Sequence, residues 1–211
     1  MGTGNNFVTR ARSCCDPGDL QAVYAEWADT YDDDLRTGTH NYVAPSIVAE
    51  TACRLGDYGK GRVLDAGCGT GLVGAALAAA GAAAIHGLDV SPHMLRVAER
   101  SGAYQAVFLD DLTREISRPS QFYDLVTCVG TFTHGHVGPI PALRELVRVV
   151  RANGHIVATI LEGIWLPGGF ETEIDKMQAE GLIRVVSSEL KHYLLGQDKA
   201  YVLVLQRCDA V

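Results

Sequence analysis

Short runs of β-branched and other apolar residues alternate along this chain with longer segments in which apolar positions recur at helical spacing. The runs that we expect to form strands are 62–66, 84–89, 105–109, 123–129, 154–161, 182–188 and 200–206. Helical patterns occupy 72–80, 92–100, 139–150 and 169–180. A regular exchange of strand and helix predicts a mostly parallel sheet with helices on both faces.

Local signals indicate where several elements end and which way the last strand runs. Ser91 is placed to cap the helix that begins at Pro92, and Gly81 is placed to end the helix before it. The last two strands are separated by the turn sequence GQDKA, which leaves no room for a crossover helix. We therefore predict a doubly wound α/β fold with seven strands, mostly parallel, and an antiparallel last strand.

The length and composition are those of one globular domain. The chain has 211 residues, of which 47% are hydrophobic and 20% are charged, enough for a sizeable core. Residues 16 to about 56 carry helical patterns but precede the first strand. We expect a single domain, with an N-terminal helical segment over 1–56 and the sheet core over 57–211.

The net charge and the cysteines indicate which binding partners and which cellular compartment to expect. The net charge of −7, without a Lys/Arg cluster, disfavours a nucleic-acid partner. The longest apolar run, 71–85, is shorter than the roughly 20 residues of a membrane span, so we expect no membrane partner. The six cysteines include no C-x-x-C pair, and the first residues lack the apolar region of a secretory signal. We expect free thiols in a cytoplasmic protein whose oligomeric state the sequence does not indicate.

The sequence VLDAGCGTGLVG, residues 63–74, combines a glycine-rich turn with an acidic residue. Gly69, Gly71 and Gly74 satisfy the G-x-G-x-x-G pattern of a dinucleotide-binding turn. Asp65, just before that turn, would repel a pyrophosphate by on the order of a few kcal/mol. A nicotinamide-dependent oxidoreductase is therefore a weak alternative. S-adenosylmethionine removes the conflict, because it carries an ammonium and a sulfonium and no phosphate.

Two further acidic positions follow the next strands in the order that such a ligand requires. Asp89, at the end of the second strand, is placed to accept both ribose hydroxyls. Asp110 or Asp111, after the third strand, is placed to hold the adenine amino group. The plainer alternative is a glycine turn with solvated acids at the strand ends, but the order and spacing favour S-adenosylmethionine.

These motifs resemble those of the class I S-adenosylmethionine-dependent methyltransferases over roughly residues 20–207. VLDAGCGTG is similar to the first family motif, GLDVS to the second, LDDL to the third and YDLVTCVGTF to the stretch entering the fourth. YAEWADTYDDDL, NYVAP, GLDVSPHML and GTFTHGHVGP further resemble the small methyltransferases related to the one encoded in the Williams–Beuren syndrome region. The resemblance implies a Rossmann-like sheet of seven strands with an antiparallel last strand, and S-adenosylmethionine as the cofactor.

The cofactor is expected to lie along the glycine turn, the strand-end acids and the N-terminal helices. Tyr24, Trp27 and Tyr31 recur on one helical face, where they are either ordinary packing or an aromatic lid over the sulfonium. The resemblance favours the lid. The residues expected to contact the cofactor are Trp27, Tyr31, Asp65, Ala66, Gly67, Cys68, Gly69, Leu72, Asp89, Val90, Met94, Asp110, Asp111, Leu112, Val129 and Gly130.

His134 and His136, which follow the fourth strand, are the candidate catalytic residues. Either could act as a general base or contact the substrate, and the alternative is a purely structural role such as capping a helix. H-x-H without a further ligand nearby is a weak metal pattern, so we expect no metal. The asparagine–proline signature of adenine and glutamine N-methyltransferases is replaced here by VGTFTHGH.

Few residues of the chain are available to form a dedicated binding site for the methyl acceptor. The stretch EGIWLPGGF, residues 162–170, is short and follows the fifth strand, and His192 and Tyr193 are expected near the same side. We therefore expect S-adenosylmethionine-dependent methyl transfer to a small-molecule acceptor. The alternative is a non-catalytic S-adenosylmethionine-binding protein that acts through a partner.

Overall fold

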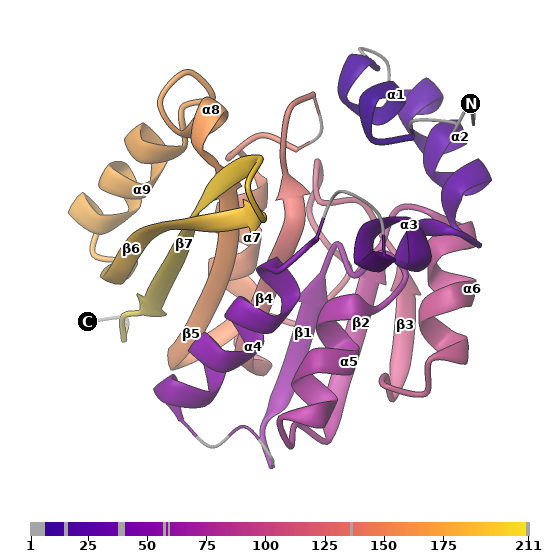
Figure 1. The fold of residues 1–211 in the computed structure, drawn as a ribbon. Helices are drawn as coiled ribbons and strands as arrows, with labels where there is room; N and C mark the ends of the chain where they lie inside the picture. Colours follow the sequence, from indigo (N-terminus) through magenta and orange to yellow (C-terminus); the bar gives the residue numbers. More distant parts are fainter. Residues whose placement is uncertain are drawn as a thin grey trace.

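A seven-stranded sheet forms the centre of the computed structural model, which describes residues 7–14, 17–37, 41–56, 58, 60–135 and 137–209 (Figure 1). The strands lie in the order β3-β2-β1-β4-β5-β7-β6. Their bounds are β1 (Arg62–Ala66), β2 (Ala84–Asp89), β3 (Ala106–Leu109), β4 (Tyr123–Phe132), β5 (Val150–Leu161), β6 (Ile183–Leu194) and β7 (Asp198–Arg207).

Strand directions follow from the length of the connections. Each of the pairs β1–β2, β1–β4, β2–β3 and β4–β5 is parallel, and long connections join these strands along the chain. β7 pairs antiparallel with both β5 and β6, because only a tight turn separates it from β6. The predicted mostly parallel sheet with an antiparallel last strand is confirmed.

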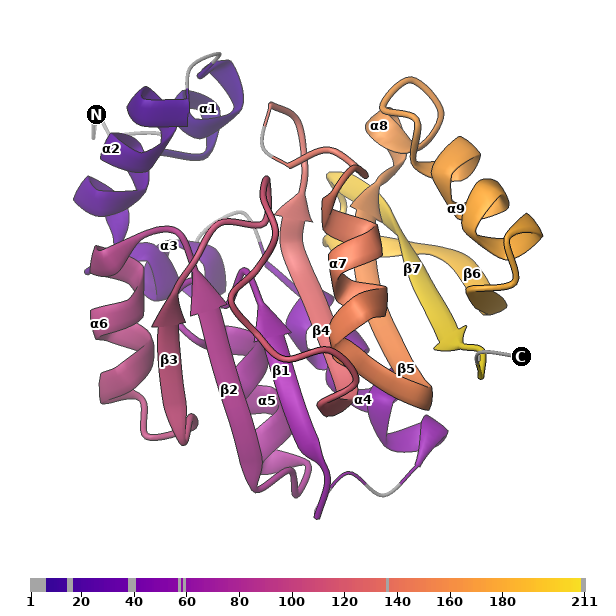
Figure 2. The same ribbon diagram turned by 180° about the vertical axis from the view of Figure 1, so that it is seen from behind.

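Helices cover both faces of the sheet and also extend beyond one end of it (Figures 1 and 2). The helices of the described residues are α1 (Phe7–Ser13), α2 (Pro17–Trp27), α3 (Tyr31–Thr37), α4 (Ala44–Leu55), α5 (Leu72–Ala79), α6 (Pro92–Arg100), α7 (Ala142–Val149), α8 (Glu162–Trp165) and α9 (Phe170–Ala179). None of the helices formed by these residues is long and apolar enough to cross a bilayer.

The core is divided by the sheet into two apolar layers. Val63 points to the side of α4 and α5, whereas the next residue, Leu64, points to the side of α7 and α9. Successive side chains of a strand face opposite ways, so a strand buried on both faces reads as a continuous apolar run. This is why the sequence of β1 shows no polar alternation.

Some element bounds differ from the sequence-based prediction. β1, β2 and α6 have the predicted bounds, and Ser91 caps α6 by accepting a hydrogen bond from the Met94 N–H at 3.3 Å. β6 continues to Leu194, six residues beyond its predicted end. β6 is an edge strand held by backbone pairing with β7, and its exposed outer residues lack the apolar pattern of a buried strand.

The described part of the N-terminal segment is helical, as predicted, and its first helices lie apart from the sheet. Figures 1 and 2 both show α1 and α2 beyond the carboxyl ends of the parallel strands, the end where α/β sheets bind ligands. Between these helices and β1, α4 packs on one face of the sheet, and Tyr42 forms an isolated bridge to Leu194. α1 and α2 therefore lie at the end of the sheet where ligands bind.

Candidate active site

A cavity of about 240 Å³ lies between the glycine loop, the ends of three strands and the N-terminal helices. Its walls are formed by most of the residues expected to contact a cofactor. From that expected set, the lining residues are Tyr31, Gly67, Cys68, Gly69, Leu72, Asp89, Val90, Met94, Asp110, Asp111, Leu112, Val129 and Gly130.

Several backbone N–H groups of the glycine loop are already bonded within the protein. Those of Gly67 and Cys68 donate to the Leu88 carbonyl at 2.7 and 2.9 Å, and that of Gly69 donates to Asp89 Oδ2 at 2.8 Å. Gly67 has φ 74°, and a Cβ there would overlap the Thr131 hydroxyl. A phosphate-binding turn needs such N–H groups for its anion, so this loop is poorly suited to a pyrophosphate.

Asp65 occupies the position at the start of α5 that an anion would otherwise take. Its side chain is fully buried and accepts hydrogen bonds from the Tyr104 hydroxyl at 2.7 Å and the Thr127 hydroxyl at 2.9 Å. The Gly74 N–H, in the first turn of α5, also donates to it. A Cβ at Gly74 would overlap the Tyr104 ring, so this glycine makes room for the tyrosine.

Burial has the largest effect on the pKa of Asp65. Loss of solvent raises its pKa to about 6, although the Tyr104 and Thr127 hydrogen bonds oppose the shift. The carboxylate lies beneath the loop and does not line the cavity, contrary to our expectation that it faces the cofactor. The neighbouring Ala66 is also fully buried and outside the cavity wall.

Asp89 is the acidic residue that reaches the cavity from β2. One of its oxygens accepts the Gly69 N–H and the other accepts the Ser91 N–H at 2.9 Å. Burial raises the pKa of Asp89, and these backbone hydrogen bonds lower it. Each carboxylate oxygen has two lone pairs, so both oxygens can accept a further hydrogen bond from a ribose hydroxyl.

The two acidic residues after β3 differ in the hydrogen bonds that they accept. Asp110 accepts the Asp111 N–H at 2.9 Å with one oxygen and the Ser117 N–H at 2.6 Å with the other. Asp111 accepts both the N–H and the hydroxyl of Thr113 with Oδ1. Its Oδ2 has only a weak approach from the exposed Arg114, at 3.6 Å. Asp111 is therefore the better placed of the two to accept from an adenine amino group.

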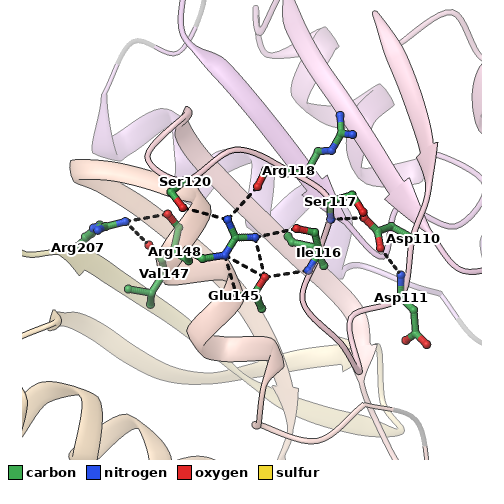
Figure 3. A network of polar contacts seen from close by, with 10 residues as sticks. All are labelled: Asp110, Asp111, Ile116, Ser117, Arg118, Ser120, Glu145, Val147, Arg148 and Arg207. Carbon is green, nitrogen blue, oxygen red and sulfur yellow. Dashed lines mark hydrogen bonds and ion pairs between the residues drawn. The ribbon is translucent and has the colours of Figure 1, made fainter.

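A buried polar network supports this loop from below (Figure 3). Glu145 accepts the Ile116 N–H at 2.8 Å and is paired with Arg148 at 2.7 Å. Arg148 also donates to the carbonyls of Ile116 and Arg118, at 2.8 and 2.9 Å. Asp110, Glu145 and Arg148 thus tie the loop that carries Asp111 and Leu112 to α7.

The aromatic side chains of the N-terminal helices divide into two groups. Tyr24 and Tyr31 line the cavity, whereas Trp27 does not. Trp27 is 3% exposed, its ring lies 4.5 Å from that of Tyr31, and its indole N–H donates to Asp34 at 2.8 Å. The indole is directed into the helical layer because its N–H finds a carboxylate there. The expectation that Trp27 contacts the cofactor is revised accordingly.

His134, one of the two candidate catalytic histidines, does not line the cavity. His134 is exposed, and its ring lies against Gly163 of α8, where a Cβ would stand 3.1 Å from the ring. Gly135 beside it does line the cavity. His136 lies outside the described residues. The described part of the chain contains no group of three His, Cys, Asp or Glu residues placed to hold a metal ion.

Several cavity residues were not singled out from the sequence. Tyr42 and Thr131 both line the cavity, and the Tyr42 and Tyr193 rings meet edge to face at 5.0 Å above Gly130. Gly130 has φ 80°, and a Cβ there would come within 2.8 Å of the Tyr42 hydroxyl. Tyr42 belongs to the NYVAP motif, which was the one available signal for it. His192 is exposed and lines neither described cavity.

Comparison with known proteins identifies the family of this site. A family model described as a methyltransferase domain matches residues 63–154. The human methyltransferase-like protein 27 is 33% identical over 165 residues, 75% of this chain and 66% of the human protein. The ubiquinone biosynthesis O-methyltransferase of Bordetella parapertussis is 32% identical over 140 residues, 63% of this chain and 53% of that protein. The chain thus spans just under two thirds of the first relative and about half of the second.

Solved structures share the fold. The TehB-like methyltransferase of Corynebacterium glutamicum aligns with a TM-score of 0.64 and 22% identity, covering 88% of this chain and 98% of that one. The magnesium protoporphyrin IX methyltransferase of Synechocystis, determined with bound S-adenosylmethionine, aligns with a TM-score of 0.56 and 17% identity. The alignment covers 98% of this chain and 92% of the Synechocystis chain.

Proposed function

Because this chain belongs to the class I S-adenosylmethionine-dependent methyltransferases, we propose that it transfers a methyl group from S-adenosylmethionine to a small-molecule acceptor. The observation that carries the proposal is the cavity at the strand ends, where Asp89 and Asp111 offer acceptor oxygens. In the glycine loop beside them, the N–H groups of Gly67, Cys68, Gly69 and Gly71 are bonded within the protein, which favours a ligand without phosphate.

The residues have distinct roles in this proposal. Asp89 accepts the ribose hydroxyls, and Asp111 Oδ2 accepts from the adenine amino group. Tyr24 and Tyr31 bring aromatic faces to the same cavity, where they attract the sulfonium. S-adenosylmethionine supplies an activated methyl group, and the chain holds the reacting groups in line and excludes water from them.

The N-terminal helices act as a lid in this proposal, with residues 1–56 covering a single domain whose core is 57–211. The Thr70 hydroxyl of the glycine loop donates to Asp32 Oδ1 of α3 at 2.5 Å. This bond joins the lid directly to the cofactor loop. With Asp33 and Asp34 adjacent, the lid carries negative charge that favours a cationic ligand.

The small-molecule acceptor and a cytoplasmic location are part of the same proposal. Relatives named as ubiquinone biosynthesis O-methyltransferases support a small acceptor. His134 is exposed and turned toward α8, so we expect its replacement by alanine to leave turnover nearly unchanged. A catalytic role for His136 remains a prediction.

Calorimetry and a labelled-methyl assay test the proposal together. We expect S-adenosylmethionine and its demethylated product to bind, and NAD to bind far more weakly. Incubation with methyl-labelled cofactor and a metabolite extract should give a labelled small molecule that mass spectrometry identifies. Tighter binding of NAD would overturn the cofactor assignment. Binding without transfer would instead favour the non-catalytic alternative.

A further inference from the structure

A second, smaller cavity of about 60 Å³ adjoins the cofactor cavity under the N-terminal helices. The two cavities share Tyr24, Tyr31, Tyr42 and Gly130. This places the second cavity beside the end of β4, next to the tyrosines proposed to face the sulfonium. Its remaining lining residues are Val8, Ala11, Trp27, Leu35, Thr133, Leu161, Tyr193 and Leu194.

The lining of the second cavity contains no acid or basic side chain among the described residues. Its polar side-chain groups are the tyrosine and threonine hydroxyls and the indole N–H of Trp27. Burial raises the pKa values of Tyr31 and Tyr42 well above the ordinary tyrosine range. These phenols stay protonated at neutral pH, so they can donate a hydrogen bond but cannot act as a general base.

The size of the cavity restricts what can enter it. An engineered apolar cavity of about 150 Å³ holds benzene, and this one is less than half as large. It therefore suits a reactive end of a few heavy atoms.

Three kinds of nucleophile fit that size, and they differ in what they demand of the wall. An alcohol must lose a proton to a base that the described wall lacks. An ammonium ion is disfavoured in an apolar space beside a sulfonium, because burying a charge without an opposite partner is costly. A thiol is ionised to a few per cent at most at neutral pH without a base, far more than an alcohol, and its thiolate is a strong nucleophile attracted by the sulfonium.

We propose that the second cavity takes the reactive end of a small aliphatic thiol, which the protein methylates on sulfur. This inference rests on the proposed methyltransferase function and names its acceptor class. The thiol releases its proton to water, and the thiolate attacks the methyl carbon. The new sulfur–carbon bond forms as the sulfonium–methyl bond breaks, and that bond's electron pair stays on the departing thioether. The tyrosine hydroxyls hold the thiolate without taking a proton from it.

An acceptor series tests the proposed chemistry. The full chain is incubated with methyl-labelled S-adenosylmethionine and 2-mercaptoethanol, ethylene glycol or ethanolamine, which share one carbon skeleton. We expect labelled thioether from 2-mercaptoethanol and no labelled ether or amine. Methylation of the alcohol or the amine in preference to the thiol would overturn the thiol assignment while leaving methyl transfer intact. Failure to bind S-adenosylmethionine would instead remove the proposed function itself.

The pH dependence of turnover distinguishes a self-ionising thiol from an enzyme base. The rate is measured against pH with 2-mercaptoethanol and with the more acidic 2,2,2-trifluoroethanethiol. We expect the rising limb of the pH–rate profile to lie at lower pH with the more acidic thiol. A limb that stays at one pH for both thiols would show a protein base and overturn the proposal.

Filling the second cavity tests its location. Ala11→Leu adds bulk to a 4% exposed position on the cavity wall. We expect kcat/KM for 2-mercaptoethanol to fall by about tenfold or more, with affinity for S-adenosylmethionine nearly unchanged. Ala78→Leu, on the exposed side of α5, is the matched control and should behave as the parent. Equal turnover in both variants would show that the acceptor reacts elsewhere.

Discussion

Asp65 lies in the motif that predicts the cofactor site, but its side chain does not line the cavity. It stands in the glycine motif, yet its carboxylate lies beneath the loop and is held by Tyr104 and Thr127. A buried carboxylate is disfavoured relative to its protonated form, so the pKa of about 6 follows from lost solvation. The residue thus fills the positive end of α5 from inside the protein and leaves the cavity to an uncharged or cationic ligand.

Replacing Asp65 by asparagine should change how stability depends on pH. The folded-state pKa of Asp65 is raised above its ordinary value, so its favourable contribution is present below pH 4 and is lost as pH rises through about 6. The shift corresponds to about 3 kcal/mol. Denaturant unfolding from pH 4 to 7 should therefore show parent stability falling relative to Asp65→Asn by that order. Parallel profiles for the two proteins would contradict the assignment.

Asp89→Ala should weaken binding of S-adenosylmethionine. The carboxylate accepts the Gly69 N–H, and in the proposed complex it also accepts ribose hydroxyls. Hydrogen bonds to a charged group are worth about 1.5–3 kcal/mol each, so a loss of at least about tenfold in affinity is expected. Calorimetry measures the effect, and Asp89→Asn, which keeps one acceptor oxygen, should lose less. An unchanged dissociation constant would show that another residue holds the ribose.

The loop after β3 depends on a helix that is distant in sequence. Arg148→Met would leave the Glu145 carboxylate and the carbonyls of Ile116 and Arg118 without their partner. We expect a loss of about 2 kcal/mol or more in stability, together with weaker cofactor binding through the displaced Asp111. Arg151→Met breaks an exposed pair with Asp124 and should cost less than about 1 kcal/mol. Similar losses in both variants would show that the network does not position the loop.

The N-terminal helices should report cofactor binding through Trp27. The indole is packed against Tyr31, which lines the cavity, so a change in lid position alters the surroundings of the ring. The sequence has two tryptophans, and in Trp165→Phe the fluorescence comes from Trp27 alone. We expect that signal to change on addition of S-adenosylmethionine. Thr70→Val removes the bond to Asp32 and should weaken cofactor affinity. A flat signal would indicate a static cover.

At the scale of the whole molecule, the strands of the sheet are distinct from the helices α1 to α3 that precede them. The described helices α1 to α3 contribute no strand to the sheet, yet their side chains close both cavities. Deleting residues 1–35 should therefore preserve the circular dichroism of the sheet core while reducing cofactor affinity and turnover. Binding by the truncated chain as tight as that of the whole chain would show that the N-terminal helices are not a lid.

The order of the elements, the strand directions and the strand ends that carry acidic residues can all be predicted from the amino-acid sequence. These features depend on local periodicity and on connection length, which are read from neighbouring residues. The bounds of β1, β2 and α6 were predicted correctly because apolar runs and caps mark them. The edge strand β6 was predicted too short because its exposed residues carry no such mark.

The directions in which the side chains of the site point depend on contacts between segments that are distant in sequence. Asp65 and Asp89 both end strands, but Tyr104, which is 39 residues along the chain from Asp65, decides that Asp65 is enclosed. In the same way the hydrogen bond from the Trp27 indole to Asp34 directs this side chain away from the larger cavity. The second cavity combines residues from both ends of the chain, such as Ala11 and Leu194. Its small uncharged wall arises from packing between distant segments, which no local pattern encodes.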